Sequence, residues 1–105
     1  MRKVCVTIKN ENGEYLPIGD IETFTILLAE CPVVGDCIII DEVDDRNCDI
    51  SKNDQICYLY DLCKQELPQG RSSGFEFEVV ERTIFRMYKE SWICVELQHK
   101  PIKRE

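Results

Sequence analysis

The chain has few of the residues on which catalytic sites usually depend, since one of its 105 residues is histidine and one is tryptophan. A cysteine nucleophile needs a base within hydrogen-bond reach. Cys94 lies five residues from His99, and on a continuous strand that spacing puts the two side chains on opposite faces. The sequence also lacks a glycine-rich phosphate loop and a Gly-x-Ser-x-Gly nucleophile elbow. We therefore predict no enzymatic activity and assign no catalytic residue.

Long apolar runs are also missing. None approaches the ~20 residues needed to cross a bilayer. The first residues alternate apolar with polar side chains, unlike the continuous apolar region of a signal peptide. The length is typical of one domain. We expect a single domain over residues 1–105 that is cytoplasmic, does not bind membranes, and has a frayed polar tail over 99–105.

Close cysteine pairs are absent, although the chain has seven cysteines. Structural zinc usually draws on Cys-x-x-Cys pairs. The nearest pairs here, Cys31 with Cys37 and Cys57 with Cys63, are each six residues apart. We predict no metal and no other cofactor. Without an export signal, the expectation is seven reduced thiols that act as small core residues.

Acidic residues, by contrast, are plentiful: 20 Asp and Glu against 13 Lys and Arg give a net charge of −7. They concentrate between Asp36 and Asp54, which argues against direct nucleic-acid binding because such a surface repels phosphates. The stretch lacks the glycine and glutamate of an EF-hand calcium loop. Its candidate interaction residues are Asp41, Glu42, Asp44 and Asp45.

Period-two alternation predicts most of the secondary structure. Residues 2–9 form a half-buried strand that ends at an Asn12-Gly13 turn. Residues 21–28 fit a strand or a helix, and their β-branched side chains favour a strand. Residues 37–40 suit a central strand. Residues 75–80, extended over 83–89, and 92–97 form a hairpin, and an uncovered edge such as 92–98 could form a homodimer.

Residues 51–67 carry a helix signal, since apolar residues recur at spacings of three and four. Ser51 can cap the start with Asp54 three residues on, and Pro68 with Gly70 marks the end. Its apolar stripe, which should pack on the sheet, consists of Ile56, Leu59, Tyr60, Cys63 and Leu67.

The aromatic residues could furnish a peptide-binding groove, but a domain this small needs most of them in its core. Tyr58 lies off the helix stripe, and Trp92 shares a strand face with Cys94 and Glu96. We therefore expect these two to be the exposed aromatics and count both as candidate interaction residues. Phe85 and Tyr88 are expected in the core.

A Pro32-x-x-Gly35-Asp36 turn precedes the Ile-rich strand, and Phe77-Glu78-Val79-Val80-Glu81-Arg82 follows later. With residues 2–9, 32–40 and 75–97, this order resembles small uncharacterised proteins of bacterial and phage genomes that look like SH3-like barrels. The resemblance implies that fold and a mobile-genome origin, with no catalytic residues. The 51–67 helix is a departure from the simplest pattern.

The fold class expected is therefore α+β, mainly β: a curled antiparallel sheet, or a small open SH3-like barrel, with one amphipathic helix at about 51–67. The leading functional hypothesis is a non-enzymatic interaction module with a protein partner. One alternative is an acidic inhibitor whose carboxylates mimic nucleic acid and occupy a basic groove on another protein. Another is a small enzyme whose site is assembled from dispersed residues.

Overall fold

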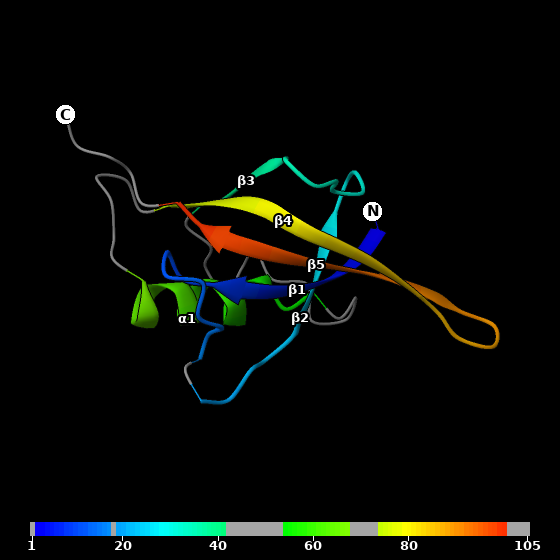
Figure 1. Ribbon diagram of the computed structural model, residues 1–105, viewed down its shortest axis with the longest axis horizontal. Coiled ribbons are helices and arrows are strands. Elements are labelled where there is room, and N and C mark those ends of the chain that lie inside the picture. Colours follow the sequence, from blue (N-terminus) through cyan, green and yellow to red (C-terminus); the bar gives the residue numbers. More distant parts are fainter. Residues whose placement is uncertain (1, 18, 42–53, 68–73, 101–105) are drawn as a thin grey trace.

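A computed structural model of the chain describes residues 2–17, 19–41, 54–67 and 74–100. It is mainly β, with one helix and one curled five-stranded sheet that forms a half-barrel (Figure 1). The sheet order is β2-β1-β5-β4-β3. In chain order the elements are β1 (Arg2–Lys9), β2 (Phe24–Leu28), β3 (Cys37–Ile40), α1 (Ile56–Glu66), β4 (Phe75–Arg86) and β5 (Ser91–His99).

The sheet is not wholly antiparallel, which corrects the expectation from sequence. β1 and β5 run parallel, with Cys5 opposite Cys94, while the pairs β1–β2, β3–β4 and β4–β5 are antiparallel. Period-two alternation marks which face of a strand is buried but carries no information on which strand it pairs with or in which direction.

Two strand positions also differ from the predictions. β5 lies in the middle of the sheet between β1 and β4, so the expected edge strand at 92–98 is wrong. β3, expected to be central, lies at one edge, where Ile39 is 67% exposed. A four-residue apolar run looks the same in either position until the long-range pairing is known.

The alternation of β1 is confirmed, because Val4, Val6 and Ile8 are all fully buried. They pack with side chains from α1, which lies on one side of the sheet (Figure 1). Each large apolar side chain so buried contributes roughly 1.5–3 kcal/mol. The rest of the core comes from alternate residues of the other strands, among them Phe24, Ile26, Phe75, Phe77, Val79, Val95 and Leu97.

The helix begins at Ile56, later than predicted. Asp54 Oδ1 accepts a hydrogen bond from the Ile56 N–H at 3.2 Å. Gln55 ties this end to β2: its N–H donates to the Thr25 carbonyl, and its Oε1 accepts from the Thr25 N–H, both at 2.8 Å. The predicted cap Ser51 and the stop at 68–70 lie outside the described residues. This tether places the first turn of α1 beside the open edge of β2.

The two predicted turns are present. Gly13 has φ 82° in the turn after β1, where the Asn10 and Glu14 backbones pair and the chain reverses. Gly35 has φ 97°, and Asp36 Oδ2 accepts from the Val33 N–H at 2.9 Å. Glycine adopts a positive φ without the steric cost that a side chain imposes.

An irregularity in β4 changes the faces of the last hairpin. The register with β5 shifts between Val79 and Glu81, so one residue is inserted there as in a β-bulge. Before the shift, Val79 pairs with Leu97 on the core side. Beyond it, odd-numbered residues of β4 face the outer side, where Phe85 pairs with Trp92. The hairpin then projects past the rest of the sheet (Figure 1).

His99 is the last residue of β5 and is 5% exposed, so the solvated histidine expected in a frayed tail is instead buried. Its ring lies against Phe75 and Phe77, with centroids 6.1 and 5.7 Å away. The Lys100 N–H donates to the Glu76 carbonyl at 2.9 Å. Pairing with β4 extends β5 beyond its apolar residues as far as His99. Residues 101–105 lie outside the described part of the chain.

Candidate functional site

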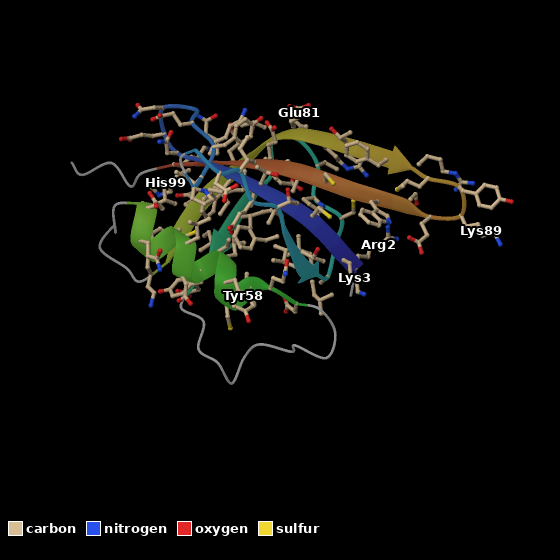
Figure 2. All side chains as sticks on the ribbon, turned by 90° about the horizontal axis from the view of Figure 1, so that it is seen from below. Arg2, Lys3, Tyr58, Glu81, Lys89 and His99 are labelled. Atoms are coloured by element: carbon tan, nitrogen blue, oxygen red, sulfur yellow. The ribbon has the colours of Figure 1, made fainter. Side chains whose placement is uncertain are left out.

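An open pocket of about 790 Å³ lies where the starts of β1, β2, β5 and α1 meet. Its size falls in the range of roughly 300–1,000 Å³ found for binding sites. The lining residues are Lys3, Cys5, Thr25, Asp54, Gln55, Tyr58, Glu90, Ser91, Trp92 and Ile93. Figure 2 shows Lys3 and Tyr58 on the same side of the molecule.

Local structure explains how these residues meet. Cys5 is paired with Thr25 on one side and with Cys94 on the other, so the three share a sheet face. Trp92 is two residues before Cys94 and joins that face by alternation. Tyr58 is 61% exposed because the helix turns its apolar stripe to the core and leaves this position outside. Strand register and the Gln55 tether together form the pocket.

The projecting tip of the β4–β5 hairpin is the second feature of this surface, and we call residues 84–92 the arm. All nine residues of the arm are exposed. Lys89 marks its far end in Figure 2, well away from the body of the molecule. Five of its side chains are large and apolar: Ile84 is 57% exposed, Phe85 51%, Met87 59%, Tyr88 92% and Trp92 48%.

The pocket and the arm are continuous, because Glu90, Ser91 and Trp92 belong to both. Trp92 Nε1 donates a hydrogen bond to Glu90 Oε2 at 3.2 Å, which orients the indole at the junction. Phe85 lies directly across from Trp92 on the neighbouring strand. An aromatic surface therefore runs from the pocket onto the arm.

The sequence-based candidates divide into three groups. Tyr58 and Trp92 are both exposed, and the structure brings them into one pocket. Asp41 follows β3 at the far edge of the sheet and does not line that pocket. The remaining candidates, Glu42, Asp44 and Asp45, lie outside the described residues.

Sequence reasoning missed the arm, because Phe85 and Tyr88 were expected in the core and are exposed. A signal was present. Charged Arg86, Lys89 and Glu90 interrupt the apolar residues of this segment on both sides of its turn, which is unusual for buried hairpin strands.

The thiols of Cys94 beside this surface, Cys63 in the core and Cys37 on β3 are poor nucleophiles. Burial, together with the neighbouring Cys5 thiol, raises the pKa of Cys94 to about 11. Burial raises the pKa of Cys63 to about 12, and a hydrogen bond to Glu76 at 2.9 Å raises the pKa of Cys37. Each shift disfavours the reactive thiolate. Cys57 is disulfide-bonded, so the expectation of seven reduced thiols is wrong.

The other charged cluster of the sheet is internally paired. Lys9 Nζ lies 2.9 Å from Glu96 Oε2, and the Tyr15 hydroxyl donates to the other oxygen of the same carboxylate. Burial alone would raise the pKa of Glu96, but these two partners outweigh it and lower that pKa. His99 faces the core, and burial lowers its pKa. Within residues 2–17, 19–41, 54–67 and 74–100, no three His, Cys, Asp or Glu side chains gather as metal ligands.

The chain matches no family model, no curated protein and no solved structure. In the portion of the chain that the structure describes, no helix has the length and apolar character to span a membrane.

Proposed function

We propose that this protein is a non-enzymatic interaction module that binds a protein partner through the pocket and the arm together. The observation that carries the proposal is the continuous exposed surface on which Tyr58, Trp92 and the apolar arm residues lie. Large apolar patches on a small domain mark interaction sites. Tyr, Trp, Phe and Met are the residue types enriched at protein interfaces.

The division of roles follows from exposure. Tyr58 and Trp92 stand at a concave site, where a partner side chain can be surrounded and water excluded, as at interface hot spots. The arm adds convex apolar surface beside it. The raised pKa of the Cys94 thiol, which lies on the same sheet face as Cys5 and Trp92, argues against thiol chemistry at this surface.

Trp92 makes the proposal directly testable, since it is the one tryptophan of the chain and its fluorescence reports the pocket. A displayed peptide library is selected on the immobilised protein, and recovered peptides are titrated while that fluorescence is followed. Tyr58→Ala should weaken binding by roughly tenfold or more, as expected for an interface hot spot. The matched control is Ile39→Ala, at an exposed site on the opposite edge of the sheet.

Two outcomes would reject the proposal. One is a selection that enriches no peptide above the empty support. The other is a pair of variants that bind the recovered peptides equally well, because the surface at Tyr58 would then have no special role. The SH3-like resemblance, the mobile-genome origin it implies and the cytoplasmic location stay predictions. So does the acidic-inhibitor hypothesis, whose carboxylates lie mostly outside the described residues.

A further inference from the structure

The arm is the part of the fold that is least covered by its own chain. A two-stranded hairpin is at best marginally stable alone in water and needs a packed face. Beyond the register shift, Ile84 pairs with Ile93 on one side and Phe85 with Trp92 on the other, so both faces of the arm carry apolar residues. The Ile84, Phe85 and Trp92 side chains are each about half exposed or more. The arm therefore presents apolar surface that its own chain leaves uncovered.

Charge separates the arm from the rest of the molecule. Arg86, Lys89 and Glu90 give the arm a net charge of +1, and since the whole chain carries −7, the remainder carries −8. The pocket combines aromatic walls with the carboxylates of Asp54 and Glu90 and the ammonium group of Lys3, and Glu90 belongs to both the arm and the pocket. The arm is apolar and carries a net positive charge, the body beside the pocket is acidic, and a single copy of the chain presents both surfaces.

We propose that the partner is a second copy of this chain: the arm of each copy occupies the pocket of the other, which forms a two-fold dimer. This inference rests on the proposed function, because it assigns a partner to the same surface. Tyr88 at the arm tip packs against Tyr58 and Trp92 of the other copy. Arg86 and Lys89 lie near its pocket carboxylates. At physiological salt the Debye length is about 8 Å, so the repulsion between the two acidic bodies is largely screened at larger separations.

The available area suits a stable dimer. An aromatic side chain buries roughly 150–250 Å², so at their observed exposures Phe85 and Tyr88 offer roughly 210–360 Å² per arm, with Trp92 counted as part of the pocket. Two arms, together with a similar area of the pockets they cover, bury roughly 860–1,430 Å², which reaches the range of a standard specific interface. Reciprocal exchange satisfies both arms at once and leaves no free surface from which an open chain of copies could grow.

The test is the mass in solution over a wide concentration range, by sedimentation equilibrium. The wild type should approach twice 12.3 kDa. Tyr88→Ser should weaken the dimer by roughly tenfold or more, as for an interface hot spot. It should leave the fold intact, because Tyr88 is 92% exposed. Ile39→Ser, at an exposed apolar site on β3, is the control and should dimerise like the wild type.

Mixing two variants distinguishes arm-in-pocket packing from other dimers. Tyr88→Ser damages the arm, and Tyr58→Ala damages the pocket. In a mixed dimer, the intact arm of Tyr58→Ala meets the intact pocket of Tyr88→Ser, and both defects fall on the other contact. In a dimer of either variant alone, both contacts are damaged. The mixture should therefore associate more tightly than either variant alone. Equal or weaker association of the mixture would overturn the arrangement.

Other outcomes separate this inference from the proposed function. A wild type that stays monomeric, or that grows into open assemblies, overturns the two-fold dimer. So does a Tyr88→Ser dimer of unchanged affinity. If the selected peptides still bind in a Tyr58-dependent way in any of these cases, the interaction module stands with a different partner.

Discussion

Acidification should destabilise the folded protein through its one histidine. His99 is buried against Phe75 and Phe77, and its Nδ1 has no hydrogen-bond partner among the described residues. Burial lowers its pKa from the ordinary value of 6.5, with Glu11 opposing the shift. The unfolded chain therefore binds a proton at a higher pH than the folded chain does. The contribution of neutral His99 to stability is complete above about pH 6.5 and is lost as the pH falls toward the folded-state pKa.

The size of the effect follows from this linkage. Where the unfolded chain is protonated at this site and the folded chain is not, stability falls by at most about 1.36 kcal/mol per pH unit. Urea unfolding of a small domain has a slope of about 1–3 kcal/mol per molar. The urea midpoint should therefore fall by up to about 0.5–1.4 M for each pH unit in that window.

The assay is urea unfolding of the wild type and of His99→Phe between about pH 7.5 and pH 5.5, the range in which histidine titrates. Phenylalanine continues the aromatic packing with Phe75 and Phe77 and does not titrate. The carboxylates titrate in both proteins. Subtracting the stability of His99→Phe from that of the wild type at each pH therefore removes their contribution. His99→Leu serves as a smaller replacement if the larger ring is poorly accommodated. A wild-type advantage or deficit that stays constant over this pH range would refute the reasoning.

Three further predictions follow from burial and pairing. Phe77→Ala should lower the free energy of unfolding by about 3–5 kcal/mol in urea denaturation, because this fully buried ring would leave a cavity; a loss below about 1 kcal/mol would contradict that. Glu96→Gln should cost about 1–2 kcal/mol near pH 7. Since the folded-state pKa of Glu96 is lowered from 4.5, its stabilisation is present above that ordinary value and is lost as the pH falls through the folded-state pKa, so the two proteins should converge as the pH falls below 4.5; a constant difference would argue against the pairing. In alkylation of the native protein followed by peptide mapping, exposed Cys37 should react before Cys63, whose pKa burial raises to about 12, and equal rates would contradict the burial.

Much of the fold could be predicted from local pattern. The alternation of Val4, Val6 and Ile8 identified a strand and its buried face, and both are confirmed. The Asn12-Gly13 turn could be predicted because glycine tolerates a positive φ. The helix could be located by its stripe, although its start moved to Ile56, where Gln55 bonds to β2. The hydrogen bonds between Gln55 and Thr25 join residues thirty apart in the chain, so the local sequence pattern could not predict them.

The candidate site could be predicted only in part. Tyr58 and Trp92 were each identified as exposed from their position on a helix or strand face, which is a local property. Their meeting in one pocket depends on the Gln55 tether and on the parallel β1–β5 pairing. The charged residues within the segment were a local sign that Phe85 and Tyr88 are exposed, but how far the hairpin projects past its neighbours depends on the long-range strand pairing.

By itself, the sequence determined local features of this protein: its acidity, the buried faces of β1, of β5 and of β4 as far as Val79, the helix α1, and the turns at Gly13 and Gly35. Each follows from side-chain period or backbone freedom within a few residues. Tertiary structure alone decided the strand order, the parallel pair, the bulge between Val79 and Glu81, and hence the arm and its pocket. These depend on contacts between residues distant in sequence, where several arrangements bury similar apolar area and only the global packing selects among them.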